Sequence, residues 1–283
     1  MTEIWKRKNK NAGLTYLTSE GVPYLSFPLL KKTGLVKHGF STRMGGVSEG
    51  KFATMNFAFT TGDNKEHVME NYRRMGRALC VSPEKMVLSY QSHTTNLLTV
   101  TAEDIGKGIT RERDYRDVDG LITNIPGITL VTFYADCVPL YFLDPVHKVI
   151  ALSHSGWRGT VNRMGEKTIE RMKKEFGSKA QDIIACIGPS ICGTCYEVGE
   201  EVAGEFEKSF DPKYLKDILT GKENGKFLLD LWKVNEIILL EAGVKTENIQ
   251  VTDICTHCNS NYLFSHRTMG KERGNLAAFL SLK

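Results

Sequence analysis

Three apolar runs between residues 128 and 153 constrain the fold more than any other feature of this sequence. They are Ile128–Tyr134, Val138–Leu143 and Val149–Ser153. Runs of this length, rich in Val, Ile, Leu and aromatic residues, are typical of buried β-strands. Three such strands in close succession predict a sheet around which the rest of the chain is organised.

Reactive side chains stand where these predicted strands end. Asp136 and Cys137 fall between the first two runs, and His154 follows the third, just before Gly156-Trp-Arg-Gly159. Polar groups at strand ends on a stiff scaffold indicate a functional site. A buried cysteine alone would not, because free Cys often serves as a small core hydrophobe.

The other segments complete an α/β pattern. Apolar residues at helical spacing predict helices at Lys65–Leu79, Gly159–Phe176, Glu200–Phe210 and Phe227–Ala242. Shorter apolar runs predict strands at Leu14–Tyr16, Tyr24–Phe27, Leu35–Phe40, Met86–Tyr90, Leu97–Val100, Leu121–Thr123, Ile183–Ile187 and Asn248–Ile254, and a last apolar segment at Leu276–Leu282. The 283 residues fit one large α/β domain spanning 1–283. We expect residues 1–12 to be mobile, or an edge strand at best, and the charged residues 102–117 to form an exposed loop.

Composition excludes several classes of protein. The net charge is +4, and the basic residues are spread along the chain with no block that would favour nucleic-acid binding. No apolar run approaches the length of a membrane span, and the N-terminus lacks the apolar core of a signal peptide, so we expect a cytoplasmic protein. Seven cysteines in such a chain argue against a disulfide framework. Nothing in the sequence indicates an oligomeric state.

One set of residues has the composition of a catalytic metal site. His93 follows the predicted strand Met86–Tyr90, and with Cys137 and His154 it supplies two imidazoles and a thiolate, which suit zinc or copper. Three protein ligands leave the fourth position of zinc open, and zinc there lowers the pKa of bound water. Asp136 is placed to orient a ligand or to act as an acid or base. A Cys137–His154 nucleophile pair for acyl transfer uses some of the same atoms and stays open as an alternative.

Two C-x-x-C pairs present a second question. Cys192 with Cys195, and Cys255 with Cys258, would together suit a tetrahedral zinc. However, residues 196–254 separate the pairs, far beyond the roughly 15–20 residues of a compact zinc ribbon. We therefore favour four reduced thiols on neighbouring loops.

Several motifs in order along nearly the whole chain resemble the YfiH/YlmD family, also called the polyphenol oxidase or laccase-domain family. The matching segments are Gly39-Phe-Ser-Thr-Arg-Met-Gly-Gly-Val-Ser48, Gln91-Ser-His93, Asp119-Gly-Leu-Ile-Thr123, Ala135-Asp-Cys-Val-Pro139, His154-Ser-Gly-Trp-Arg-Gly159, Ile187-Gly-Pro189, Tyr196-Glu-Val198 and Phe264-Ser-His-Arg267. Each motif alone is weak, but jointly they are highly specific. One departure is Thr94, where the family often has glycine, which affects substrate preference more than metal binding.

The resemblance implies one α/β domain with a mixed sheet flanked by helices, and a zinc ion on His93, Cys137 and His154. It also implies phosphorolysis of adenosine, inosine, guanosine and methylthioadenosine to the base and a ribose 1-phosphate, together with adenosine deamination. The expected partners are therefore purine nucleosides and phosphate. An older view of the family is a copper-dependent laccase that oxidises phenols.

Phosphorolysis requires an anion site beside C1′ of the ribose. Arg43, in the glycine-rich segment 38–48, is the first candidate for phosphate, and Arg158 is the second. Ser41 and Asn56 are candidates for substrate binding, and Asp136 for proton transfer to the leaving base. A glycine-rich hairpin with a solvated Arg43 is the alternative for that segment.

Two further alternatives remain at this point. A laccase needs several copper centres and many histidines, whereas this chain has seven histidines and no His-x-His pair, although its single site would suit copper. The other alternative is a protein that binds a metal or nucleoside without turnover.

Overall fold

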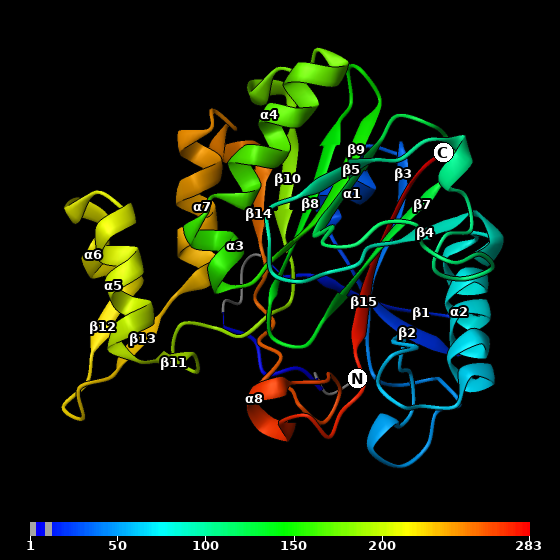
Figure 1. The fold of residues 1–283 in the computed structure, drawn as a ribbon, viewed down its shortest axis with the longest axis horizontal. Coiled ribbons are helices and arrows are strands. Elements are labelled where there is room, and N and C mark those ends of the chain that lie inside the picture. Colours follow the sequence, from blue (N-terminus) through cyan, green and yellow to red (C-terminus); the bar gives the residue numbers. More distant parts are fainter. Residues whose placement is uncertain (1–3, 9–12) are drawn as a thin grey trace.

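The computed structural model of this chain describes residues 4–8 and 13–283. At its centre two six-stranded sheets stack face to face, and helices cover their outer faces (Figure 1). The α/β fold with mixed strands flanked by helices is confirmed, with two central sheets in place of one. The expected mobility of residues 1–12 falls partly outside the described residues; Trp5, within them, is buried against Tyr16 and Tyr262.

The first sheet contains both the first and the last strand of the chain, β1 and β15. Its strands, from edge to edge, are β1 (Thr15–Ser19), β2 (Val22–Ser26), β3 (Val36–Ser41), β15 (Leu276–Leu282), β7 (Thr129–Tyr134) and β4 (Met86–Leu88). Only β4 and β7 pair in parallel; the other neighbours are antiparallel. The strands predicted at Leu14–Tyr16 and Tyr24–Phe27 correspond to β1 and β2, which form an antiparallel hairpin.

The second sheet carries the middle of the chain. Its strands, in spatial order, are β14 (Ile249–Val251), β10 (Ile184–Ile187), β8 (Val138–Asp144), β9 (Val149–Ser155), β6 (Gly120–Thr123) and β5 (Leu97–Thr99). The pairs β10–β14 and β5–β6 are parallel. A small third sheet holds β11 (Glu197–Val198), β13 (Phe227–Leu229) and β12 (Leu219–Gly221).

Alternate residues of the central strands enter different layers of the core. In β8, Tyr141 and Leu143 belong to the apolar cluster between the sheets, whereas Leu140 and Phe142 belong to the cluster under the helices. Successive side chains of a strand point to opposite faces, so a strand covered on both faces is apolar throughout. This burial explains why three continuous apolar runs, rather than alternating ones, mark the centre of the molecule.

Helix α2 (Lys65–Leu79) forms at its predicted bounds and covers the outer face of the first sheet with Val68, Tyr72 and Met75. The Asn64 side chain accepts a hydrogen bond from the Glu66 amide and caps its first turn. Helices α4 (Met164–Phe176) and α7 (Leu231–Glu241) cover the second sheet. The remaining helices are α1 (Pro28–Lys32), α3 (Trp157–Val161), α5 (Glu200–Ser209), α6 (Pro212–Ile218) and α8 (His266–Met269).

Two predicted helices differ from the structure. The segment Gly159–Phe176 is broken between α3 and α4, where Arg163 has a left-handed conformation with φ of 60°. In Phe227–Ala242 the first residues form β13, and the Asp230 carboxylate then caps α7 by accepting hydrogen bonds from the amides of Trp232 and Lys233. The apolar residues keep their helical spacing across both boundaries, so the sequence pattern gives no sign of either break. The breaks are set instead by the left-handed backbone of Arg163 and by the capping carboxylate of Asp230.

The charged segment 102–117 was expected to be an exposed loop, and in part this is wrong. Lys107 is buried because its ammonium binds the carboxylates of Asp104, at 2.7 Å, and Asp114. Charges that neutralise one another in this way can be buried in a loop. None of the helices in the described residues is long and apolar enough to cross a membrane.

Candidate metal centre and active site

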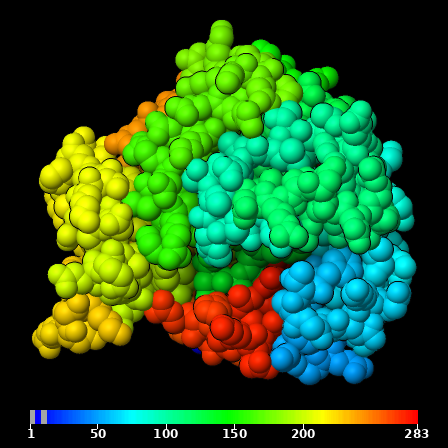
Figure 2. Space-filling model, in the orientation of Figure 1, coloured from blue at the N-terminus to red at the C-terminus, as the bar shows by residue number. Residues whose placement is uncertain are grey.

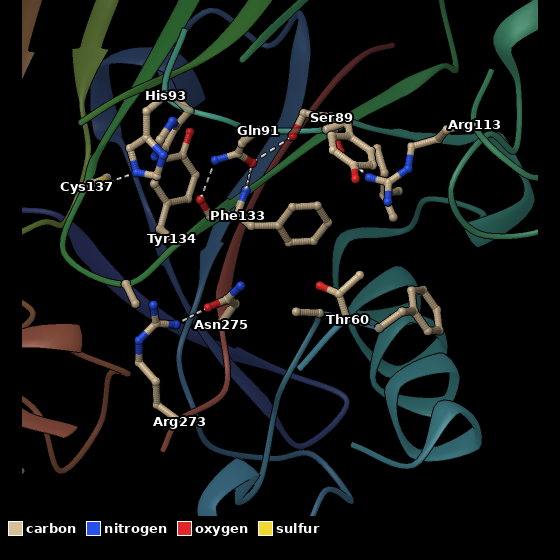
Figure 3. Close-up of a pocket in the computed structure, with 16 residues that line it drawn as sticks. Thr60, Ser89, Gln91, His93, Arg113, Phe133, Tyr134, Cys137, Arg273 and Asn275 are labelled. Atoms are coloured by element: carbon tan, nitrogen blue, oxygen red, sulfur yellow. Dashed lines mark hydrogen bonds between the residues drawn. The ribbon is translucent and has the colours of Figure 1, made fainter. Parts of the chain in front are cut away.

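The structure brings the three predicted metal ligands together. Their ligand atoms all lie within 4.8 Å of one another, and the Cys137 Sγ atom lies 3.9 Å from Nε2 of His93 (Figure 3). His93 lies in the loop between β4 and β5, Cys137 in the tight turn between β7 and β8, and His154 near the end of β9. Three segments from both sheets therefore meet at one point.

Asp119 organises this centre from behind. Its buried carboxylate accepts hydrogen bonds from the consecutive amides of Ser92, His93 and Thr94, and lies 2.8 Å from Nδ1 of His154. The loop that bends around the carboxylate gives His93 a φ of 66°. One carboxylate thus fixes the backbone of one histidine and the ring of the other, an arrangement typical of groups that support metal ligands.

Charge interactions within the centre favour a thiolate. Burial would raise the pKa of the Cys137 thiol, but the neighbouring imidazoles of His154 and His93 lower it to about 6. Burial would lower the pKa of His154, but Cys137 and Asp119 raise it to about 9. The carboxyl of Asp119 has a lowered pKa, because the bonds from His154 and the amides outweigh its burial. A metal binds the thiolate of Cys137 and the neutral imidazole of His154, so metal binding would displace the proton that the raised pKa keeps on His154.

The donor set fits a tetrahedral metal with one open position. Zinc bonds of about 2.3 Å to sulfur and about 2.0 Å to nitrogen place the ligand atoms of such a site roughly 3.3–3.5 Å apart. The observed separations need only small side-chain adjustments to reach this geometry. Because Nδ1 of His154 is hydrogen-bonded to Asp119, Nε2 of His154 is the nitrogen available to a metal. The described residues around this point supply three ligands, and a fourth position stays available to water or substrate.

A cavity of about 370 Å³ opens on one side of the centre. Its lining combines aromatic side chains with amide and guanidinium groups (Figure 3). The aromatic residues include Phe59, Tyr90, Phe133 and Tyr134, and the polar ones include Gln91, Asn275 and Arg113. Gln91 is fixed by hydrogen bonds with the backbone of Phe133 and the hydroxyl of Ser89. Figure 2 shows this face of the molecule hollowed between the C-terminal segment, in red, and the blue and green segments. Flat aromatic walls with fixed polar groups suit a heterocyclic base.

A second cavity of about 280 Å³ also opens beside Cys137. Three guanidinium groups line it, those of Arg158, Arg267 and Arg273, and Asp136 is also part of its wall. Arg158 stacks on Trp157 and Arg267 on Tyr196, at 4.3 and 5.3 Å from the ring centroids. Stacked arginines are held in place and suit a phosphate or carboxylate. The two cavities share His93, Ala135, Cys137 and Arg273.

Arg273 has an unmet hydrogen-bonding group at this junction. Its Nε atom is buried and has no hydrogen-bond partner among the described residues, while Nη1 binds Asn275 and the Gly274 carbonyl. A buried donor without a partner is rare and costs about 1–3 kcal/mol. A bound anion would satisfy it, and the position of Arg273 between the two cavities is where such an anion would lie.

The first phosphate candidate has a different position. Arg43 donates from Nε to the Ala53 carbonyl and from Nη1 to the Ser260 carbonyl, and it stacks on Phe264 at 4.7 Å. Neither Arg43 nor Ser41 lines either cavity; the buried Ser41 hydroxyl accepts the amide of Ala277. These contacts hold the glycine-rich segment against the sheet. The phosphate role of Arg43 stays a prediction that its position outside both cavities does not support.

Asn56 supports the site from behind, whereas Asp136 lies in the wall of the second cavity. The Asn56 Oδ1 atom accepts the amides of Ala58 and Asn275, two residues that line the larger cavity. Asp136, with a φ of 89°, accepts the Thr256 hydroxyl on one carboxylate oxygen and the Arg267 amide on the other, both at 2.6 Å. Arg158, the second phosphate candidate, does line a cavity beside the thiol.

Sequence reasoning missed Asp119, Arg113 and Arg273. Asp119 lies within a motif that carried the family resemblance, but only folding shows that its carboxylate faces the 92–94 loop. Arg113 lies in the charged segment, and its guanidinium stacks on Tyr90 at 4.7 Å. Arg273 follows the Phe264-Ser-His-Arg267 motif by a few residues, in a polar turn that gave no signal.

The chain is similar to known proteins over most of its length. The family model described as "Multi-copper polyphenol oxidoreductase laccase" matches residues 37–283. A protein of Bacteroides thetaiotaomicron named purine nucleoside phosphorylase is 37% identical over 254 residues, 89% of this chain and 93% of the relative. A protein from an unknown prokaryotic organism named adenosine deaminase RL5 is 33% identical over 83% of this chain and 90% of its own length.

The fold has a close counterpart among solved structures. The crystal structure of the hypothetical protein YfiH from Bacillus licheniformis superposes with a TM-score of 0.88 and 29% identity, over 95% of this chain and 99% of that one. The stacked sheets and their helical layers are thus an arrangement already observed by experiment.

Proposed function

The chain belongs to the YfiH/YlmD family, whose model is that of the laccase-type polyphenol oxidoreductases, and from this premise we propose that it is a metal-dependent purine nucleoside phosphorylase that also deaminates adenosine. One observation carries the proposal: an aromatic cavity and an arginine-lined cavity meet at His93, Cys137 and Arg273. A nucleoside and a phosphate ion need two such cavities that adjoin.

The proposed metal is zinc on His93, Cys137 and His154, with copper as the alternative ion. When bound with an open position, zinc supplies a Lewis acid and lowers the pKa of coordinated water. Asp119 holds His154 and the His93 loop in the orientation that binding requires. The thiolate form of Cys137 is prepared by the two imidazoles before the metal arrives.

In phosphorolysis a phosphate oxygen forms a bond to C1′ of the ribose while the bond from C1′ to N9 breaks. The base leaves with the electron pair and takes a proton, and the other product is ribose 1-phosphate. We place phosphate in the cavity of Arg158, Arg267 and Arg273, whose charges hold the anion at C1′. The base lies between the aromatic walls of the larger cavity, near Gln91 and Arg113.

Asp136 positions this phosphate site. Both its carboxylate oxygens accept strong hydrogen bonds, one of them from the amide of Arg267. The carboxylate therefore anchors the segment that carries one of the three arginines. We therefore propose that Asp136 holds the phosphate site in place, instead of the proton transfer to the leaving base that the sequence suggested.

Substitution of Arg158 tests the placement of phosphate. In Arg158→Gln we expect the KM for phosphate to rise at least about tenfold, because a charged, stacked donor is lost. Deamination, which consumes water and no phosphate, should change less than about twofold. The matched control is Arg116→Gln, an exposed arginine outside both cavities. Equal losses of both activities in Arg158→Gln would remove phosphate from this cavity.

One observation favours a second candidate function. The lowered pKa of Cys137 beside His154 is also what a cysteine hydrolase requires. The two functions differ in their response to chelation: a hydrolase stays active without metal, whereas the nucleoside enzyme stops.

The choice between copper and zinc needs a separate experiment. It asks which of the two ions restores base release to the metal-free protein.

A further inference from the structure

Four cysteines outside the active centre converge although the chain between the pairs is long. Cys192 and Cys195 lie in the loop after β10, and Cys255 and Cys258 lie in the loop after β14. Strands β10 and β14 are parallel neighbours, so both loops leave the same edge of the second sheet (Figure 1). All four sulfur atoms lie within 4.8 Å of one another. The parallel pairing of β10 and β14 thus brings the two C-x-x-C pairs together, as a short spacer does in a zinc ribbon.

The sulfur separations match shared coordination. The Sγ atoms of Cys195 and Cys258 are 3.5 Å apart. A disulfide requires about 2.05 Å, whereas four sulfurs at about 2.3 Å from a tetrahedral zinc lie about 3.8 Å from one another. Each pair also has the two-residue spacing that lets one loop present two thiolates to one ion.

Hydrogen-bond donors surround the cluster. The Cys255 sulfur accepts the amides of Cys192, at 3.3 Å, and Cys258, at 3.5 Å. The Thr194 hydroxyl lies 3.2 Å from the Cys192 sulfur and receives a hydrogen bond from the ammonium of Lys8. Donors and a cation around sulfur stabilise the thiolate form that metals bind.

Four thiols this close cannot all ionise without a cation. Like charges at this separation disfavour one another. A divalent ion at the centre of the four sulfurs removes this conflict.

We propose that Cys192, Cys195, Cys255 and Cys258 hold a zinc ion in a closed tetrathiolate site, separate from the active centre. Four protein ligands leave no open position, which makes the ion structural. The four cysteines do lie on neighbouring loops, as the sequence suggested. Because their sulfur atoms converge on one point, we now favour a bound zinc ion over four free thiols.

The site would stabilise the wall of the phosphate cavity. Ile191, which precedes Cys192, donates its amide to the Asp136 carbonyl, and Thr256, which follows Cys255, donates its hydroxyl to the Asp136 carboxylate. The ion would therefore lock the two loops that hold Asp136 beside Cys137. This inference stands on the four sulfurs alone and does not require the proposed nucleoside chemistry.

Metal content of the full-length protein, purified without chelators, tests the proposal. We expect two zinc ions per chain in the wild type and one in each of Cys137→Ala and Cys195→Ser/Cys258→Ser. Cys80→Ser, which replaces an exposed cysteine outside both clusters, should keep two. The half-exposed pair is chosen because replacement of the buried Cys192 or Cys255 risks misfolding.

Two further measurements separate the outcomes. Cobalt bound to the Cys137→Ala protein should show the strong visible absorption of tetrahedral cobalt with intense thiolate charge-transfer bands, and the double serine variant of that background should lose it. The intact mass of the denatured, unreduced protein should match free thiols. Two disulfides by mass, iron instead of zinc, or one zinc per chain that vanishes in Cys137→Ala would overturn the tetrathiolate zinc site.

Discussion

At the scale of single residues, Asp119 is the group on which the proposed metal centre depends most. It contacts His154 directly and His93 through the backbone, yet it is not itself a ligand. Such supporting carboxylates typically contribute 10- to 100-fold to metal affinity.

In Asp119→Asn we expect zinc affinity at the active centre to fall about 10- to 100-fold, because a neutral amide presents an N–H where the loop amides need an acceptor. Competition with a chromophoric chelator measures the loss. Saturating zinc should restore much of the base release, which distinguishes weakened binding from a damaged fold. Asp117→Asn, at an exposed neighbouring carboxylate, should behave as wild type. Unchanged zinc affinity in Asp119→Asn would contradict the assigned role.

Histidine 38 gives a prediction about pH and stability. Its ring is buried and Nε2 accepts the Phe27 amide at 2.9 Å, so burial lowers the pKa of His38 to about 4. The unfolded state therefore binds a proton that the folded state refuses. The contribution is fully present above the unfolded value near pH 6.5, and up to about 3 kcal/mol is lost as the pH falls from there to 4.

Urea denaturation at pH 7 and pH 5 checks this linkage. The midpoint for the wild type should fall more between these values than the midpoint for His38→Gln, whose amide oxygen accepts from the same donor without taking a proton. His67→Gln, on the surface helix α2, should retain the wild-type dependence. An identical pH dependence in all three proteins would show that His38 is not the linked group.

At the scale of elements, apolar runs predicted the strands of the core and α2 well, because burial on both faces of a strand and on one face of a helix leaves a direct pattern. The boundaries at Asp230 and Arg163 were missed because a capping carboxylate and a left-handed residue disturb no such pattern. The proposed metal ligands were identified from residue types at strand ends. The arginines that line the second cavity, apart from Arg158, come from a polar turn and helix with no periodicity to detect.

The cap of α2 tests whether this helix stabilises the fold without entering the site. In Asn64→Ala we expect the free energy of unfolding to fall by about 1 kcal/mol, because the Glu66 amide loses its acceptor. Lys65→Ala, one residue further on, should change stability little. Base release per folded molecule should stay at the wild-type level in both variants. A loss of activity in Asn64→Ala at full folding would show that α2 influences the site.

At the scale of the whole molecule, the two stacked sheets deliver ligands that are far apart in the chain to one point. Cys137 lies between a strand of the first sheet and a strand of the second, while His154 comes from the second sheet alone. The sequence identified the candidate ligands and one arginine of the second cavity. It could not identify the second cavity itself, because that cavity forms only where α3, α8 and the loop after β10 approach Cys137.

The central claim is that the centre of His93, Cys137 and His154 carries phosphate-dependent cleavage of purine nucleosides. The most direct measurement is release of hypoxanthine from inosine, with and without phosphate, by the metal-stripped protein before and after zinc is returned. We predict negligible release without metal, recovery with zinc only when phosphate is present, and no recovery in Cys137→Ala. Full phosphate-dependent release by the metal-free wild type, or by Cys137→Ala, would contradict the claim.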